Sequence, residues 1–166
     1  SHSVSLVNLV ANTMVSSFLV GQAPNGSALT PDGGRAFIVN YLSNTVSVAD
    51  TSTNRVTDTV QVGLTPTRVA FAPEGKAAFV TNAIGSSVSV INTTDLSVAN
   101  TISISSGGST LARPDGVLVA IGGKRLYVAL YGDGFGSEVE VFSTETSNVI
   151  DLIPVGDGPF AMALVP

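Results

Sequence analysis

FVTNAIGSSVSVINTTDLSVANTISI, residues 79–104, decides the fold, because an earlier part of the chain repeats its pattern. A shift of 42 residues places FVTN at 79–82 on FIVN at 37–40, and places VSV at 88–90 on VSV at 46–48. The same shift carries VSV back to VSL at 4–6 and aligns further turn residues, namely Gly21 with Gly63, Pro24 with Pro66, Pro31 with Pro73 and Gly33 with Gly75. Many independent positions agree in one register, so the chain is a tandem repeat.

A third copy follows, but it needs two insertions. Phe79 meets Tyr127 at a shift of 48 residues, and Val88 meets Val139 at a shift of 51 residues. Six residues are therefore inserted before Pro114, and three more after Tyr127.

Each unit holds four apolar segments, which we call A to D, separated by turn residues at a spacing that suits short strands. Their sequences are GSALTPDG, RVAFAPEG and GVLVAIGG for segment A; RAFIVN, KAAFVTN and RLYVAL for B; VSVAD, VSVIN and EVEVF for C; and VTDTVQV, VANTISI and VIDLIPV for D. A four-stranded meander cannot bury both of its faces alone, so such units stack radially. The sequence predicts an all-β fold, a β-propeller of four-stranded antiparallel blades. Asp32-Gly33, Glu74-Gly75 and Gly122-Gly123 are predicted hairpin turns between segments A and B.

The unit boundaries predict one propeller domain or propeller fragment over residues 1–166. A partial blade at 1–33 supplies segments C, D and A, and units at about 34–75, 76–123 and 124–166 follow. This makes fifteen strands, one fewer than a closed four-bladed ring needs. Three arrangements remain open: a four-bladed ring with one defective blade, a piece of a larger propeller, or two chains that complete one ring.

These segments resemble the YVTN family of β-propeller repeats. The stretch at 79–104 and TVSVADTSTNRVTDTVQVGLTPTRVAFAPEG at 45–75 match its pattern of YVTN, VSVID, a Val/Ile-rich strand, VG, Pro and an SPDG-like turn. The last unit departs most, with YVAL in place of YVTN. The resemblance implies a propeller of a cell-surface layer or a secreted protein, and it implies no particular ligand, because the matching positions are core and turn residues.

The composition excludes several kinds of partner. The net charge is −5, and the seven Lys and Arg form no basic stripe, which argues against nucleic acid. No apolar run approaches the roughly 20 residues that a membrane helix needs, so we expect no membrane insertion. Cysteine is absent, which excludes thiol chemistry. Few Lys and many Ser, Thr and Asn favour an extracellular or cell-surface location.

Both insertions, near 105–113 and 131–137, should project from one face, because the D-to-A and B-to-C connections of an antiparallel blade lie on the same side. Function usually concentrates on loops elaborated at one end of a rigid scaffold. The candidate ligand-binding residues on this face are Asn25, Arg68, Arg113, Asp115, Tyr131, Asp133, Phe135 and Phe160, with Thr67 and Tyr41 beside them. They could offer hydrogen bonds, charge and an aromatic platform to a small polar or glycan-like ligand. The competing interpretation is that the Asp-Gly pieces are turns and the arginines pair with carboxylates between blades.

Catalytic, metal and cofactor sites have little support. The single histidine, His2, lies near one end of the sequence, so a Ser-His-Asp triad is not expected. Asp133, Glu138 and Glu140 invite a calcium site, but their spacing matches no EF-hand or RTX loop, and Glu138 and Glu140 share the parity of a solvated strand face. We therefore predict no catalytic residue, no metal and no cofactor.

Three functional hypotheses follow. The first is a non-catalytic binding or scaffold module that contacts a glycan or protein ligand through the face with the insertions. The second is a propeller enzyme, a lyase or hydrolase with an axial active site. The third is a propeller fragment that assembles with copies of itself into a homo-oligomer.

Overall fold

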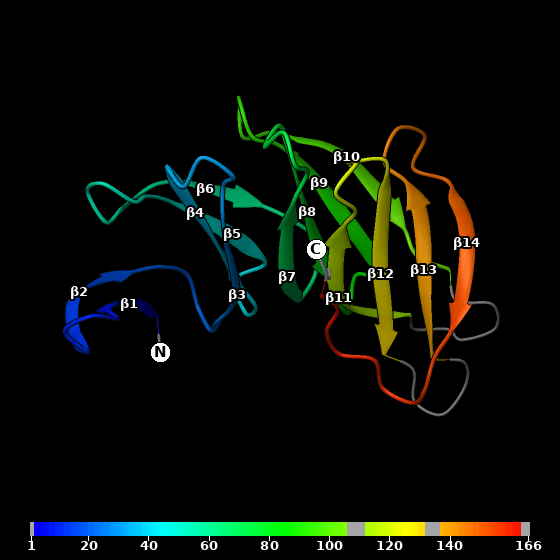
Figure 1. The fold of residues 1–166 in the computed structure, drawn as a ribbon, viewed down its shortest axis with the longest axis horizontal. Helices are drawn as coiled ribbons and strands as arrows, with labels where there is room; N and C mark the ends of the chain where they lie inside the picture. Colours follow the sequence, from blue (N-terminus) through cyan, green and yellow to red (C-terminus); the bar gives the residue numbers. More distant parts are fainter. Residues whose placement is uncertain (1, 106–111, 132–136, 164–166) are drawn as a thin grey trace.

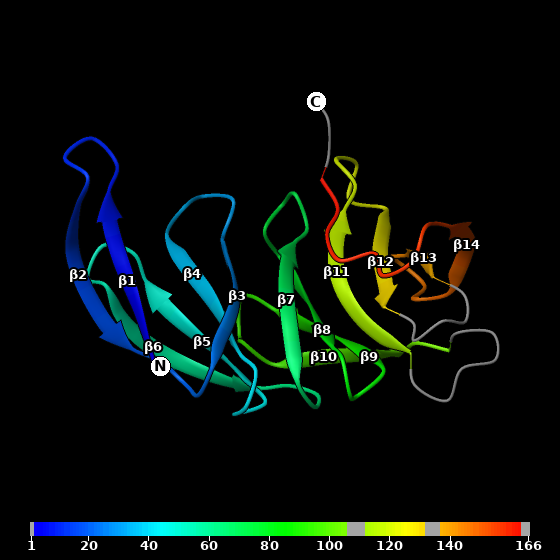
Figure 2. The ribbon, with the colours of Figure 1, turned by 90° about the horizontal axis from the view of Figure 1, so that it is seen from below.

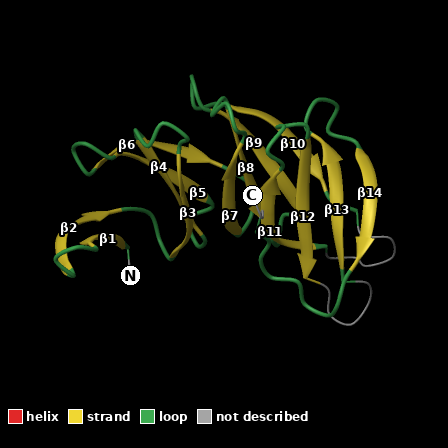
Figure 3. Ribbon diagram, in the orientation of Figure 1, coloured by secondary structure: helices red, strands yellow, loops and turns green. Residues whose placement is uncertain are grey.

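The computed structural model describes residues 2–105, 112–131 and 137–163 of the chain. Within these residues the backbone forms fourteen β-strands and no helix (Figure 3). There is accordingly no helix among them that is long and apolar enough to cross a membrane. The predicted all-β fold class is confirmed.

The strands form one hairpin and three antiparallel four-stranded sheets, each following the order of the chain. The hairpin consists of β1 (Ser3–Asn8) and β2 (Thr13–Leu19). The first blade is β3 (Pro24–Leu29), β4 (Arg35–Asn40), β5 (Thr45–Asp50) and β6 (Arg55–Gln61). The second blade is β7 (Pro66–Phe71), β8 (Ala77–Asn82), β9 (Ser87–Asn92) and β10 (Val98–Ser103). The third blade is β11 (Arg113–Val119), β12 (Arg125–Tyr131), β13 (Glu138–Ser143) and β14 (Val149–Pro154).

The blades stand side by side in an open arc (Figures 1 and 2). Segment A forms the inner strand of each blade: β3 and β4 contact β7, and β7 and β8 contact β11. The hairpin β1–β2 stands at one end of the arc and β14 is the outer strand at the other (Figure 2). This is the radial stacking that the repeat predicts for propeller blades.

The sequence predicted fifteen strands, one more than the fourteen strands found in the described residues. The last segment A begins after Val155, and residues 155–163 form no strand. In each complete blade segment A pairs with a segment B, as β7 pairs with β8. In the described part of the chain no strand pairs with residues 155–163, so their backbone groups lack the ladder that would make them a strand.

The predicted hairpin turns between segments A and B are confirmed. Gly33, Gly75 and Gly123 have φ angles of 72°, 72° and 70°, in the left-handed region that favours glycine. Each turn glycine also accepts a hydrogen bond from the threonine that follows segment C. Its hydroxyl donates to the glycine carbonyl at 2.7 Å for Thr51, 2.6 Å for Thr93 and 2.6 Å for Thr144.

Two apolar clusters hold the three blades together. The first joins the first and second blades, where Phe37 and Val39 of β4 share a core with Ala78 and Val80 of β8. The second joins the second and third blades and is built mainly from large side chains, which are Phe79, Val88, Ile102, Ile104, Leu126, Val128, Leu130 and Phe142. The core therefore lies between blades, because alternate residues of each strand face opposite neighbours.

Candidate binding site at the inner strands

Each inner strand has a proline as its first or second residue, and the two residues after that proline occupy equivalent places in the arc. These pairs are Asn25-Gly26, Thr67-Arg68 and Asp115-Gly116, followed by Phe160-Ala161 in the segment after β14. The first unit has a neutral pair here, whereas the later units bring a cation, a carboxylate and an aromatic ring. The candidate site is built from the residues that differ between units at these equivalent positions.

Glycine at two of these places lets neighbouring units approach closely. A Cβ added to Gly26 would stand 2.5 Å from the carbonyl oxygen of Thr67. A Cβ added to Gly116 would stand 3.2 Å from the carbonyl oxygen of Phe160 and 3.5 Å from the Cα of Ala161. Residues 160–161 therefore lie against β11 much as residues 67–68 lie against β3, although they form no strand.

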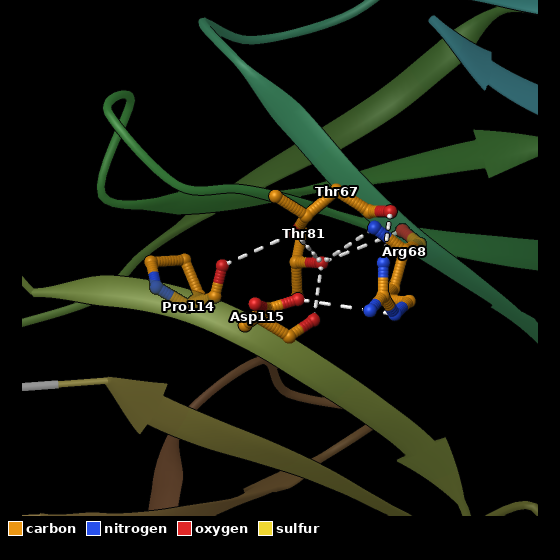
Figure 4. Close-up of polar contacts among 5 residues, drawn as sticks. All are labelled: Thr67, Arg68, Thr81, Pro114 and Asp115. Carbon is orange, nitrogen blue, oxygen red and sulfur yellow. Dashed lines mark hydrogen bonds and ion pairs between the residues drawn. The ribbon is translucent and has the colours of Figure 1, made fainter. Parts of the chain in front are cut away.

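Threonine hydroxyls fix the second unit to the third (Figure 4). The Thr81 hydroxyl, on strand β8, donates to the carbonyl oxygen of Asp115 at 2.8 Å and accepts from the backbone N–H of Arg68 at 3.1 Å. It also lies 2.9 Å from the Thr67 hydroxyl, which in turn lies 3.4 Å from the carbonyl oxygen of Pro114. Thr67 and Thr81 are both buried. This network sets the backbone of Arg68 beside that of Asp115.

Arg68 is held by three neighbours. Its Nε lies 3.8 Å from Oδ1 of Asp115, and a terminal guanidinium nitrogen donates to the Thr67 carbonyl at 3.2 Å (Figure 4). Its guanidinium carbon also lies 4.9 Å from the centre of the Phe160 ring, within the range of a cation–π contact. The Arg68 side chain remains 27% exposed, so the guanidinium is positioned without being sealed from solvent.

Asp115 is an unusual partner because much of its carboxyl group is withdrawn from water. Burial raises the pKa of Asp115, and the positive charge of Arg68 opposes that rise. Oδ1 is buried, and its main polar interaction is the ion pair with Arg68; the Thr67 hydroxyl also opposes the rise in the pKa of Asp115. The site thus offers a carboxyl oxygen and a guanidinium side by side.

The structure brings only some of the predicted site residues together. Arg68, Asp115 and Phe160 contact one another as described. Arg113 and Tyr131 form a second group, because they are cross-strand partners at the ends of β11 and β12. Asn25 is exposed and lines a separate hollow with Pro24, Gly26, Ser27, Ser3, Val4 and Ile38. Asp133 and Phe135, and most of both insertions, lie outside the described residues.

The prediction that Glu138 and Glu140 form a solvated face was wrong for Glu140. Its side chain is only 1% exposed, and Oε2 has no hydrogen-bond partner. Burial, followed by the nearby charge of Glu138, raises the pKa of Glu140 to about 7. Glu140 pairs with Val128 in the strand register, as Ser89 pairs with Val80 and Ser47 with Ile38. Aligning it with these buried serines would have revealed its burial.

Glu140 occupies the place of a polar cluster that the other blades share. In the second blade the Asn82 side-chain amide donates to the hydroxyls of Ser87 and Ser89, at 3.1 and 3.0 Å. The third blade has Leu130 in place of that asparagine, and Glu138 and Glu140 in place of the hydroxyls. The carboxyl group has therefore lost the amide that serves this position elsewhere.

No metal-binding group of three or more His, Cys, Asp or Glu side chains occurs in the part of the chain that the structure describes. The calcium hypothesis depended on Asp133, which lies outside that part.

Comparison with known proteins supports the fold and leaves the family open. A scan of family models and a search of curated proteins each found no match. Among solved structures, Kuenenia stuttgartiensis hydrazine synthase is 25% identical, with a TM-score of 0.85 over 93% of this chain and 43% of that one. Dihydro-heme d1 dehydrogenase NirN, in complex with DHE, is 18% identical, with a TM-score of 0.72 over 94% of this chain and 33% of that one. The chain thus spans less than half the length of either. Both are β-propeller proteins, and the chain shares their fold.

Proposed function

We propose that the chain is a binding module that holds a neutral, polyhydroxylated ligand such as a glycan at the inner-strand site. The observation that carries the proposal is the convergence of Arg68, Asp115 and Phe160 from three successive units. The first unit has no charge or aromatic ring at the equivalent positions. Where a repeat protein departs from its own repeat pattern, we expect the departing residues to serve a specialised function such as binding.

The chemistry of the three side chains suits hydroxyl groups. A guanidinium donates hydrogen bonds and a carboxylate accepts them. Arg68 can therefore donate to one hydroxyl of a sugar, while Asp115 accepts from a neighbouring hydroxyl. Because their charges offset each other, the site favours a neutral ligand over an anion. Phe160 is 57% exposed, and its ring supplies an apolar surface for the C–H face of a sugar.

The insertion face supports the same proposal. Arg113 and Tyr131 stand where the two insertions meet strands β11 and β12, and Tyr131 is 41% exposed. A bound glycan extending from the inner strands toward this face would meet them. The predicted cell-surface location, and a protein partner or a second copy of the chain in place of a glycan, stay predictions.

Titration calorimetry with neutral oligosaccharides tests the proposal, using cellotetraose, chitotetraose and maltotetraose as probes. We expect one of them to bind with little dependence on salt, and Arg68→Gln or Phe160→Ala to weaken its binding at least tenfold. Arg55→Gln is the matched control, because Arg55 is exposed on the outer strand β6. Absence of binding for all three sugars, or equal affinities in all variants, would contradict the proposal.

The second candidate function is an enzyme, which two observations favour and one opposes. Both of the similar proteins are enzymes by name, and burial raises the pKa of Glu140 to about 7, the range that suits a general acid or base. Its 1% exposure argues against direct contact with a substrate. Hydrolysis of p-nitrophenyl glycosides that is lost in Glu140→Gln would favour the enzyme, whereas no turnover in the parent protein would leave binding as the activity.

A further inference from the structure

The residue before the segment C strand of each complete blade makes a repeated set of hydrogen bonds. These three residues, which we call the clamp residues, are Asn44 before β5, Ser86 before β9 and Ser137 before β13. The backbone carbonyl of each accepts a hydrogen bond from the residue that follows the outer strand of its blade. These donors are Val62 at 3.0 Å, Ile104 at 2.9 Å and Val155 at 3.1 Å. The clamp residues therefore hold the start of each connection to the next inner segment.

The side chains of the clamp residues hold the far end of the same connections, one or two residues before the next inner proline. The hydrogen bonds run from the Thr65 N–H to Asn44 Oδ1 at 2.8 Å, from the Ser86 hydroxyl to the Ala112 carbonyl at 2.8 Å, and from the Gly158 N–H to Ser137 Oγ at 3.1 Å. Each connection is thus fixed at both ends by one residue.

The residues of the inner-strand site follow directly after these fixed points. Arg68 comes three residues after Thr65, and Asp115 comes three residues after Ala112. Phe160 comes two residues after Gly158. A proline lies within each of these short stretches, and its ring fixes its own φ angle. Little backbone freedom therefore remains between a clamp residue and the site residue of the next unit.

Thr65 shows that the clamped conformation is imposed on the chain. Its φ angle is 57°, in the left-handed region where a β-branched residue is an outlier. Gly158, at the equivalent place before its proline, has a φ angle of 67° without that strain. Strain of this kind persists only where surrounding contacts hold it, and the hydrogen bond to Asn44 is such a contact. The backbone that enters β7 toward Arg68 is therefore held against its own preference.

We propose that the three clamp residues are the positioning residues of the inner-strand site. Each belongs to the preceding unit and fixes the place of one site side chain, Arg68, Asp115 or Phe160. Side chains that are fixed before binding lose less conformational freedom when the ligand arrives. The effect on ligand affinity rests on the proposed function, whereas the placement of the three side chains can be measured without a ligand.

The first test follows Phe160 by NMR. Ser137→Ala removes the acceptor for the Gly158 N–H, whereas Ser137→Thr keeps a hydroxyl group. The Phe160 ring centre lies 4.9 Å from the Arg68 guanidinium carbon, so the ring current shifts the resonances of the Arg68 side-chain protons. We expect Ser137→Ala to move these resonances toward their values in Phe160→Leu, and Ser137→Thr to resemble the parent protein. Parent-like resonances in Ser137→Ala would overturn the proposal.

The second test follows Arg68 through its effect on Asp115. Asn44→Gly removes the side-chain acceptor and suits the backbone, because the φ angle of Asn44 is 56°. Asn54→Gly is the matched control, with a φ angle of 54° in the turn between β5 and β6. We expect Asn44→Gly to raise the pKa of Asp115 in a carboxyl-carbon NMR titration, because a less fixed guanidinium opposes the effect of burial less. Equal pKa values of Asp115 in the two variants would overturn the proposal.

Ligand affinity separates this inference from the proposed function. If one of the tetrasaccharides binds the parent protein, we expect Ser137→Ala and Asn44→Gly to weaken its binding by up to about tenfold. Ser137→Thr and Asn54→Gly should bind like the parent protein. Unchanged affinity in both clamp variants would overturn the positioning role while the proposed function stands. If no sugar binds the parent protein, the proposed function fails, and the two NMR measurements decide whether the clamp residues position the three side chains.

Discussion

Asn82 lies directly against Gly63, where the connection from β6 to β7 passes the end of β8. A Cβ on Gly63 would stand 2.6 Å from Cγ of Asn82, closer than carbon atoms can approach. Gly21 and Asn40 have the same relationship, also at 2.6 Å. This contact explains why the repeat carries a glycine before the inner strand and an asparagine at the end of segment B.

Gly63→Ala should therefore destabilise the protein. The new methyl group must displace a fully buried amide that makes two hydrogen bonds, and overpacking of this kind costs about 1–3 kcal/mol. Urea denaturation measures the free energy of unfolding. Gly122→Ala is the matched control, because a Cβ there meets nothing within 4 Å. Equal stabilities of the two variants would contradict the packing role.

Thr93→Val tests the hydrogen bond that closes each blade at its turn. The Thr93 hydroxyl is buried and donates to the carbonyl of Gly75 at 2.6 Å, and valine keeps the shape while removing the donor. We expect a loss of about 1 kcal/mol in the free energy of unfolding. The exposed neighbour Thr94, changed to Val, should cost much less. A similar loss in both variants would assign the effect to turn propensity.

Much of the fold could be predicted from the sequence, because the repeat marks the same physical tasks in each unit. Gly33, Gly75 and Gly123 identify the turns, and the alternating segments identify strands buried between blades. The final segment A was predicted as a strand because its sequence resembles the earlier segments A. A strand also needs a neighbouring strand with which it forms hydrogen bonds. No local signal shows that such a partner is absent.

The candidate site was predicted only in part. Position after the inner proline identified Arg68, Asp115 and Phe160, because equivalent places in a repeat converge toward one end of the inner strands. Glu140 was misjudged, because a glutamate on an alternating strand usually faces solvent, and its burial depends on a neighbouring blade. Thr81 was also missed, since its role depends on contacts with a strand more than thirty residues away.

Removing the charge of Arg68 should raise the pKa of Asp115 further. Burial already raises this pKa, and the guanidinium is the main opposing influence. A carboxyl-carbon NMR titration of Arg68→Met measures the shift directly. Arg55→Met is the control, because Arg55 lies on the outer strand of another blade. An unchanged pKa of Asp115 in Arg68→Met would show that the pair contributes little electrostatic energy at 3.8 Å.

Combining Arg68→Met with Asp115→Asn measures how strongly the two side chains are coupled. The pair is partly exposed, with side-chain exposures of 27% and 17%, so solvent screens the attraction. A double-mutant cycle in urea denaturation should give a coupling of about 0.5–1 kcal/mol, decreasing at high salt. A coupling that does not change with salt would indicate packing against Phe160 as its origin.

Glu140→Gln should make the protein more stable at alkaline pH and leave it nearly unchanged at acid pH. The pKa of Glu140 is raised from 4.5 to about 7 on folding, so the unfolded chain ionises first as the pH rises. The folded state binds the proton more tightly, and stability therefore falls between about pH 4.5 and pH 7 and then levels off. The full penalty is at most about 3 kcal/mol, and glutamine removes it.

Urea denaturation from pH 5 to pH 9 should show the stability curves of Glu140→Gln and the parent protein separating as the pH rises. Glu145→Gln, at an exposed turn of the same blade, should follow the parent protein. Parallel curves for Glu140→Gln and the parent would mean that the carboxyl group is solvated or paired in solution.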